Sequence, residues 1–271
     1  MAHDYETRVE EALQAGMTGW DFGWLKGRAD GEGPSWDYGR LARARLPRAR
    51  SLLDIDTGGG EFLASLAPLP PASAATENWP PNLPLARRRL SPLGVEVHRA
   101  SGLNLPSGPF DLILNRHGLL DAASVRAALA PGGRLLTQQV GSRNQTELNE
   151  AVGIPAPADP DDWTLDVAVR ALEGAGLRVT TAREEMSPYV FRDMGAVVFQ
   201  LCAIPWQFPG FDPSAHEPAL RRLDRHIGSA GGFTAHDHRF LIEVRAGSRC
   251  PEDAPDEVGS TWNPPLDSCP F

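Results

Sequence analysis

The segment Leu53-Asp54-Ile55-Asp56-Thr57-Gly58-Gly59-Gly60-Glu61 decides the fold of this 271-residue chain. It joins an apolar strand, expected at 51–55, to a helix expected at 61–67 through a glycine-rich turn. Glycines in such a turn accept positive φ angles and let a ligand approach the backbone. The start of the following helix favours a negatively charged group. The segment therefore predicts a strand–turn–helix unit with a ligand site at the turn.

Strands and helices continue to alternate after this unit. Further strands are expected at 74–77, 95–98, 110–115, 134–140 and from 177, and helices at 82–93, 122–130 and 161–173. The apolar run 192–204 fits a strand or a helix, and helix is favoured because the run is long and Asp193 can cap it. A helix is expected at 213–227, and a last strand at 239–244 could close the sheet antiparallel.

This alternation predicts an α/β fold. We expect a doubly wound, mostly parallel seven-stranded sheet with helices on both faces. Right-handed crossovers then place the carboxyl ends of the parallel strands, and any ligand, at one edge of the sheet.

Three regions are expected along the chain. Residues 1–47 form an N-terminal helical and aromatic cap segment with helices at 5–16 and 38–47, residues 48–248 form the α/β domain, and residues 249–271 form a Pro-rich acidic tail. The aromatic segments 20–24, 36–38 and 206–211 lie outside the strand–helix pattern. They form either a lid over an apolar acceptor pocket or an added hydrophobic layer, and both interpretations stay open.

Composition excludes several classes of protein. The formal net charge of -9 argues against a protein devoted to binding nucleic acid, although five of those charges lie in the tail. No apolar run of about 18 residues predicts a membrane span, and the N-terminus has no secretory signal pattern. A cytoplasmic protein is expected. Cys202 is expected in the core, while Cys250 and Cys269 lie in the tail, where a disulfide is the less favoured interpretation.

The turn also indicates the class of ligand. Glu77 ends the second expected strand, 19 residues after Gly58. An acid at this place can accept hydrogen bonds from ribose hydroxyls, which predicts an adenosine-containing ligand. The dinucleotide pattern lacks its third glycine, because Leu63 stands there. A P-loop lysine is absent, because Lys26 is the only lysine.

With these motifs in this order, the chain resembles the class I S-adenosylmethionine-dependent methyltransferases over residues 48–245. The first motif of that family maps onto Asp54, Asp56, Gly58 and Gly60, and the acid after the second strand maps onto Glu77. The strand at 110–114 and the turn at 129–133 also match. The segments 77–82 and 115–117 resemble a bacterial subgroup of these proteins.

The resemblance implies a cofactor, a product and their site. The cofactor is S-adenosyl-L-methionine, the product is S-adenosyl-L-homocysteine, and the acceptor is a small molecule. The implied cofactor-binding residues are Asp54, Asp56, Thr57, Gly58, Gly60, Glu77, Asn78, Trp79, Ser101, Gly102, Asn115 and Arg116. Two of these have a second interpretation: Asp54 as a carboxylate that ties the loop, and Trp79 as a packing residue instead of a stacking partner for adenine.

The sequence departs from the family pattern at two places. Asp56 replaces the first motif glycine. An aspartate can adopt a left-handed conformation at a cost on the order of 1 kcal/mol. Its charge could repel the cofactor's carboxylate or attract its ammonium and sulfonium. After the third strand the family often has an acid near the adenine amine, whereas this chain has Ala100-Ser101-Gly102, so Ser101 or a backbone group would serve.

His117 is the candidate catalytic base, because it follows the fourth strand at the ligand edge. A base is needed only for a protonated acceptor, and a structural histidine is the alternative. Arg116 could bind an acidic substrate or form an ion pair, and one of Gln138 and Gln139 is expected to face the pocket. No metal is expected: His236 and His238 fit a solvated loop better than a metal site.

Two further functions remain open at this stage. Arginines at 40, 43, 45, 48 and 87–89 could contact phosphates, as in an rRNA or tRNA methyltransferase. Asp56 also fits a non-catalytic binding protein that keeps the fold. The acceptor and the oligomeric state are beyond the sequence.

Overall fold

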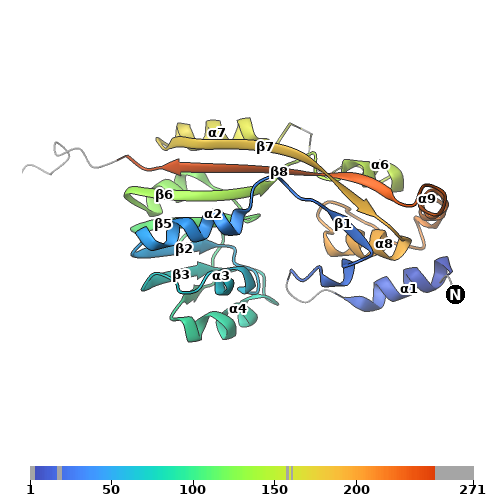
Figure 1. Ribbon diagram of the computed structural model, residues 1–271, viewed down its shortest axis with the longest axis horizontal. Coiled ribbons are helices and arrows are strands. Elements are labelled where there is room, and N and C mark those ends of the chain that lie inside the picture. The colour runs from blue at the N-terminus through green and yellow to red at the C-terminus, as the bar shows by residue number, and fades with distance from the viewer. Residues whose placement is uncertain (1–3, 17–19, 157–158, 160, 248–271) are drawn as a thin grey trace, which may run out of the picture.

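The computed structural model describes residues 4–16, 20–156, 159 and 161–247. Within them a mixed eight-stranded sheet runs in the order β1-β7-β8-β6-β5-β2-β3-β4, with helices packed around it (Figure 1). The expected tail, with Cys250 and Cys269, lies outside the described residues. No helix in the described part of the chain is long and apolar enough to cross a membrane.

The elements follow the expected alternation, but helix α6 was not expected, and β7 and β8 are longer than the strands expected from 177 and at 239–244. The strands are β1 Ala29–Gly31, β2 Ser51–Ile55, β3 Ala72–Thr76, β4 Glu96–His98, β5 Phe110–Arg116, β6 Leu129–Val140, β7 Arg178–Phe191 and β8 Phe233–Arg245. The helices are α1 Tyr5–Ala15, α2 Tyr38–Arg45, α3 Glu61–Ser65, α4 Leu83–Leu90, α5 Ala122–Ala128, α6 Thr146–Val152, α7 Leu165–Gly174, α8 Met194–Ala203 and α9 Glu217–Ala230.

The predicted α/β architecture is confirmed. Strands β4, β3, β2, β5 and β6 pair in parallel, and β8 closes the sheet antiparallel to β6 and β7. The sheet has one strand more than the seven expected. The extra strand is β1, which pairs antiparallel with β7 at the edge of the sheet. Three residues reading Ala-Asp-Gly carry no strand signal of their own, so this strand exists only through its partner.

Helices cover both faces of the sheet. In β2 successive side chains point to opposite faces, so Leu52 joins a core with α2, α3 and α4, whereas Leu53 joins a core with α5 and α7. Both leucines are fully buried. This double cover holds the parallel strands rigidly, and their carboxyl ends meet at one edge.

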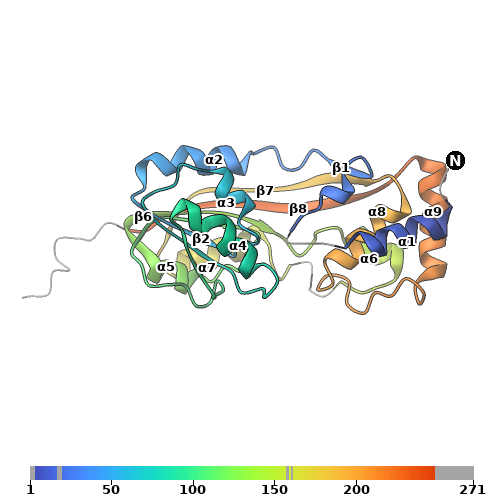
Figure 2. The ribbon, with the colours of Figure 1, turned by 90° about the horizontal axis from the view of Figure 1, so that it is seen from below.

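A separate helical lobe, made of α1, α6, α8 and α9, surrounds the far end of the long β7–β8 pair (Figure 2). Its centre is α8, the helix expected at 192–204, and the predicted cap is confirmed, because Asp193 Oδ1 accepts a hydrogen bond of 2.9 Å from Ala196 N. The expectation that Cys202 lies in the core is wrong. Cys202 is exposed, whereas the other nine residues of α8 are buried.

Helix α2 is fastened to the sheet by a buried carboxylate. Glu243 of β8 is 6% exposed and receives hydrogen bonds from Arg45 Nε at 2.9 Å and from Arg134 Nη1 at 3.1 Å. Burial alone would raise the pKa of Glu243, but the hydrogen bonds and charges of the two arginines hold it below its usual value. Removing this carboxylate would therefore leave two cations without their partner.

We expect Glu243→Ala to lower the free energy of unfolding by about 2–3 kcal/mol, because one partner of a largely buried ion pair is lost. The measurement is urea unfolding followed by circular dichroism near neutral pH. Glu6→Ala is the matched control, since Glu6 pairs with Arg221 at an exposed site and should change stability little. Equal effects of the two substitutions would contradict this account of how α2 is held.

Candidate functional site

The turn after β2 contains three left-handed residues. Asp56, Gly58 and Gly60 have φ angles of 53°, 65° and 81°. The left-handed conformation considered for Asp56 is thus confirmed. Its carboxylate is fastened, because Oδ2 accepts a hydrogen bond of 2.9 Å from Leu119 N in the loop after β5. The aspartate that replaces the motif glycine therefore ties two loops together at the ligand edge.

Helix α3, which follows the turn, is shorter than the helix expected at 61–67. It ends at Ser65, and Pro68 and Pro70 follow closely. Proline disfavours helical conformation in the residue before it, which explains the early end. One and a half turns of helix contribute little electrostatic attraction, so a ligand here depends on the turn and its side-chain neighbours.

Gly58 is covered by an indole ring from the helical lobe. A Cβ atom added to Gly58 would lie 2.7 Å from Trp20 Cδ1, closer than any real contact of this kind. Trp20 also meets Trp206 edge to face, with ring centroids 5.4 Å apart. These two tryptophans remain 44% and 58% exposed. The lobe therefore reaches the glycine turn through an aromatic pair that is still open to solvent.

Glu77 lies beside the turn, just after β3. It is 4% exposed, and its Oε1 accepts a hydrogen bond of 2.6 Å from Trp79 N. Burial raises the pKa of Glu77, while the N–H groups of Trp79, Gly58 and Asn78 act against that effect. The side chain of Trp79 is 60% exposed, and Asn78 is exposed too. The structure thus brings a held carboxylate and an open aromatic ring to the same loop.

Asp54 and Arg116 stand on either side of the turn. Asp54 is buried at the end of β2, and burial raises its pKa to about 7. Arg116 ends β5 as an exposed residue, and its guanidinium lies 4.2 Å from the ring centroid of Phe62. No described acid forms an ion pair with Arg116. The positive charge of Arg116 acts on the buried carboxylate of Asp54 and opposes the rise of its pKa.

Ser101 and Gly102 follow β4 and complete this side of the edge. Ser101 is half-buried and Gly102 is buried. A Cβ atom on Gly102 would lie 2.0 Å from the carbonyl oxygen of Leu119, so only glycine lets these two loops meet. The loops after β2, β4 and β5 therefore converge on Leu119.

Asn115 is buried, and its amide is already used within the protein. Its Oδ1 accepts hydrogen bonds from Gly118 N and from Gln139 Nε2, both at 3.0 Å, and its Nδ2 donates to Leu119 O at 3.1 Å. Asn115 thus shapes the loop after β5. A direct role in binding a cofactor stays a prediction for this residue.

His117 is the end of a hydrogen-bonded chain that sequence reasoning missed. Trp36 Nε1 donates to Gln138 Oε1 at 2.7 Å, and Gln138 Nε2 lies 2.8 Å from His117 Nε2. An indole N–H can only donate, so it fixes the orientation of the Gln138 amide. The amide nitrogen then donates to His117 Nε2, which must accept. His117 is therefore neutral and carries its proton on Nδ1.

The surroundings of His117 also favour the neutral ring. Desolvation by the protein around the ring, together with the charges of Arg239 and Arg116, lowers the pKa of His117, although part of the residue's surface is exposed. With Nε2 occupied by Gln138, the ring presents a donor at Nδ1. It can accept a proton from a ligand only after that hydrogen bond breaks.

Buried polar atoms without partners lie near the turn. Among the described residues, Oδ1 and Nδ2 of Asn82 are buried and have no hydrogen-bond partner. Asn82 lies in the loop after Glu77, at the start of α4, and is 1% exposed. Buried polar groups are nearly always paired, so these atoms are what a bound ligand or ordered water would satisfy. Sequence reasoning did not single out Asn82.

The expectation that His236 and His238 lie in a solvated loop is wrong: both belong to β8, and His238 is 1% exposed. His236 Nδ1 lies 2.7 Å from Glu147 Oε1, and His238 Nε2 lies 2.9 Å from Glu184 Oε1. No group of three or more metal-ligating side chains is assembled within the part of the chain that the structure describes.

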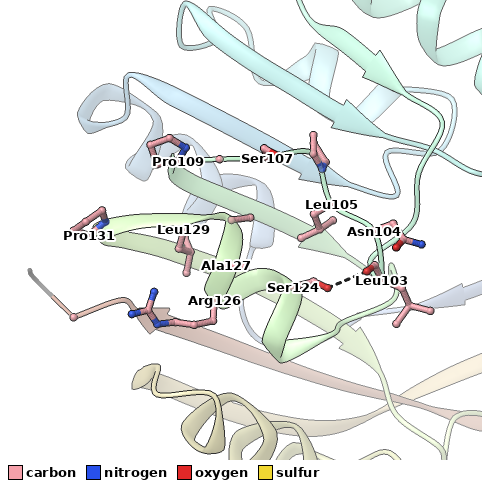
Figure 3. A pocket seen from close by; sticks show the side chains of 14 residues that line it. Leu103, Asn104, Leu105, Ser107, Pro109, Ser124, Arg126, Ala127, Leu129 and Pro131 are labelled. Atoms are coloured by element: carbon pink, nitrogen blue, oxygen red, sulfur yellow. Dashed lines mark hydrogen bonds between the residues drawn. The ribbon is translucent and has the colours of Figure 1, made fainter. Parts of the chain in front are cut away.

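A pocket of about 790 Å³ lies away from the turn. It is formed between the loop 103–109 and α5, where Ser124 Oγ donates to Leu103 O (Figure 3). Its lining includes Pro109 and Pro131, near the amino ends of β5 and β6. None of the residues expected to bind the cofactor lines it, so this pocket is not the site at the glycine turn.

We expect the imidazole of His117 to remain neutral at about pH 6 in the folded protein, as the Nδ1–H tautomer. The ring should stay neutral because Gln138 donates a hydrogen bond to Nε2 and because two nearby positive charges disfavour a protonated ring. The measurement is ¹⁵N NMR of the ring nitrogens, with the unfolded protein as control, where the ring should titrate near its ordinary pKa of about 6.5. An imidazolium signal from His117 in the folded protein at that pH would overturn the assignment.

Comparison with known proteins gives matches of structure only. No protein-family model matches the sequence, and no curated protein matches it at a significant level. The chain is similar in structure to a candidate methyltransferase from Bacillus halodurans (TM-score 0.55, 14% identity, covering 78% of this chain and 99% of that chain). It is also similar to the YcgJ protein of Bacillus subtilis (TM-score 0.56, 13% identity, covering 78% and 99%).

A third similar structure is that of the [4+2]-cyclase SpnF (TM-score 0.51, 14% identity, covering 90% of this chain and 93% of that chain). The TM-scores show a shared fold, whereas sequence identities this low leave the reaction open. The cyclase among these structures illustrates that one fold serves several chemistries. Together with the strand order and the glycine turn at the carboxyl edge, these matches show that the chain has the class I methyltransferase fold.

Proposed function

We propose that this protein transfers a methyl group from S-adenosylmethionine to a small-molecule acceptor. The observation that carries the proposal is the contact between the backbone N–H of Gly58 and the carboxylate of Glu77. The left-handed turn after β2 and the buried carboxylate after β3 lie side by side at the carboxyl edge of a class I methyltransferase fold.

The residues at the edge fit this cofactor in charge and shape. Glu77 is positioned to accept hydrogen bonds from ribose hydroxyls. The exposed ring of Trp79 and the backbone at Ser101 and Gly102 are suited to the adenine, and the unpaired atoms of Asn82 offer further hydrogen bonds. Asp54 and Asp56 favour the ammonium and the sulfonium. When bound, the cofactor would supply an electrophilic methyl group.

Methyl transfer of this kind depends first on orientation of the acceptor. The acceptor would enter beside His117, because this residue follows β5, next to the turn. His117 in its neutral form can donate a hydrogen bond from Nδ1 and so orient an acceptor. It acts as a base, as the sequence suggested, only if Gln138 releases Nε2.

Several contacts favour a small acceptor over RNA. Two of the arginines considered for phosphate contacts are engaged within the protein: Arg45 pairs with the buried Glu243, and Arg89 donates to Gly59 O and to Glu61. Trp20 lies against Gly58 and contacts Trp206, so the edge near the turn carries an exposed aromatic wall. Such a wall suits a small molecule with apolar surface.

Isothermal titration calorimetry with S-adenosylmethionine tests the proposal directly. We expect saturable binding to the wild-type protein and a loss of about tenfold to a hundredfold in affinity for Glu77→Ala, because hydrogen bonds to a charged group are lost. Glu96→Ala is the matched control: Glu96 is an exposed acid on the neighbouring strand β4, and its loss should leave affinity unchanged. If the protein does not bind S-adenosylmethionine at millimolar concentration, the proposed function is refuted.

The affinity for S-adenosylmethionine should rise between about pH 6 and about pH 8. The pKa of Asp54 is raised to about 7, so the carboxylate that favours the cofactor's positive charges is neutral at the lower pH and ionised at the higher. Asp54→Asn carries no charge at either pH and should flatten this part of the dependence. Titration of the ligand's own ammonium affects both proteins equally, so the same slope in both would exclude a role for Asp54.

A further inference from the structure

A basic pocket lies at the edge of the sheet opposite the glycine turn. Its volume is about 510 Å³, and it is formed by the end of α2, the segment before β2, the starts of β5 and β6, and the end of β8. Two acids line it, Asp111 and Glu243. The lining also includes five arginines: Arg45, Arg48, Arg50, Arg134 and Arg245. The pocket therefore has an excess of positive charge.

Both acids of this pocket are already used within the protein. Glu243 receives the hydrogen bonds of Arg45 and Arg134 that fasten α2. Oδ2 of Asp111 accepts hydrogen bonds from Arg50 N at 2.8 Å and from Ser51 N at 3.3 Å. One carboxylate thus serves the attachment of α2 and the other serves the backbone before β2.

Three arginines of the pocket keep most of their charge uncompensated. Arg48 and Arg245 are exposed, and no carboxylate within the described ranges pairs with either. The side chain of Arg50 is 94% exposed, and its Nε lies 3.9 Å from Asp111 Oδ2, which makes this ion pair a weak one. Guanidinium groups bind carboxylates in charge-assisted hydrogen bonds. The pocket therefore suits an occupant that carries several carboxylates.

The end of β8 brings an acidic segment of this chain to the same place. Strand β8 ends at Arg245, away from the helical lobe (Figure 1). Ala246 N donates to Gly133 O at 2.9 Å, and Gly132 N donates to Gly247 O at 3.1 Å. Because Gly132 and Gly133 line the pocket, Gly247 is fixed at its rim. Residues 251–271 carry five acids and no base, and four of the acids stand at 252, 253, 256 and 257.

These four acids follow Gly247 closely enough to reach the pocket. An extended chain spans about 3.3–3.6 Å per residue, so residue 252 can lie up to about 17 Å from Gly247 and residue 257 up to about 35 Å. Attachment to the same chain also gives the acids an effective concentration on the order of millimolar at the pocket. An anion from solution must reach a similar concentration to compete.

We propose that the acidic segment 252–257 binds in the arginine pocket and pairs with Arg48, Arg50 and Arg245. Its carboxylates balance the charge that Asp111 and Glu243 leave uncompensated. The bound segment then covers the junction between α2 and the sheet. Since the pocket lies away from the glycine turn, this contact forms whether or not a cofactor is bound there.

Labelling of arginines with phenylglyoxal, read residue by residue by mass spectrometry, tests this contact in the 271-residue chain at low salt. The wild-type protein is compared with a neutral variant that carries Glu252→Gln, Asp253→Asn, Asp256→Asn and Glu257→Gln. We expect Arg48, Arg50 and Arg245 to react about threefold to tenfold faster in the neutral variant. The difference should disappear in about 0.5 M NaCl. Arg88, an exposed arginine of α4 outside the pocket, should react equally in both proteins.

A charge-matched variant separates binding from the general field of the acids. It neutralises four exposed acids elsewhere: Glu10→Gln, Glu32→Gln, Glu96→Gln and Glu150→Gln. The three pocket arginines should react as slowly in this variant as in the wild-type protein, and acceleration equal to that in the neutral variant would overturn the proposal. Equal labelling of the wild-type protein and the neutral variant would overturn it too. If inorganic phosphate then slowed both, the occupant would be an anion from solution.

Limited proteolysis tests the same contact from the side of the acids. With an endoproteinase that cleaves after glutamate, we expect cleavage after Glu252 and Glu257 to be about threefold to tenfold faster when Arg48→Gln and Arg245→Gln are combined. Arg88→Gln is the matched control and should leave the rate unchanged. Thermal unfolding of each variant checks that the fold is intact. An unchanged rate in the double variant would contradict the assigned pairing.

Discussion

The left-handed turn after β2 is the constraint on which the arrangement of the ligand edge depends. It reverses the chain between a buried strand and α3 within a few residues, and this brings the Gly58 backbone next to Glu77. The same turn is tied to the loop after β5, because Asp56 accepts a hydrogen bond from Leu119 N. Leu119 O in turn lies against Gly102 after β4. Three loops that belong to separate strands are therefore fixed relative to one another by short contacts around one residue.

An aspartate at the first motif position costs backbone energy on the order of 1 kcal/mol. The hydrogen bond that its side chain makes offsets this cost.

A second set of contacts joins the N-terminal segment to the same edge. Tyr38 of α2 receives a hydrogen bond from Asn115 N and donates to Leu136 O, and Trp36 orients Gln138. The consequence is chemical as well as structural. Because the indole N–H of Trp36 can only donate, it determines which atom of the Gln138 amide faces His117, and so which nitrogen of His117 carries the proton. The segment before the first parallel strand thus sets the protonation state of His117, the candidate base.

The sequence predicted the elements between residues 51 and 140 well, because each carries a local signal: an apolar strand, a glycine or proline boundary, and a helix period. It failed where structure depends on distant partners. Strand β1 has no signal of its own, and the length of β7 is hidden by Glu184, Glu185 and Pro188, which fit a strand only because β8 pairs with them. The motifs singled out Gly58 and Glu77, and the structure brings the backbone of Gly58 beside the carboxylate of Glu77. The contacts of Trp20 with Gly58 and of Gln138 with Trp36 join residues far apart in the chain, and no local pattern indicates them.

The long β7–β8 pair explains how a shared fold acquires a particular site here. Both strands continue past the parallel sheet, and their far ends carry α8 and α9, against which α1 and the segment of Trp20 pack. Since the strands belong to the sheet at one end and to the helical lobe at the other, the position of Trp20 relative to Gly58 is set by a continuous hydrogen-bonded ladder. If the proposed function holds, the choice of acceptor would depend on residues that reach the turn from this end of the molecule, such as Trp20.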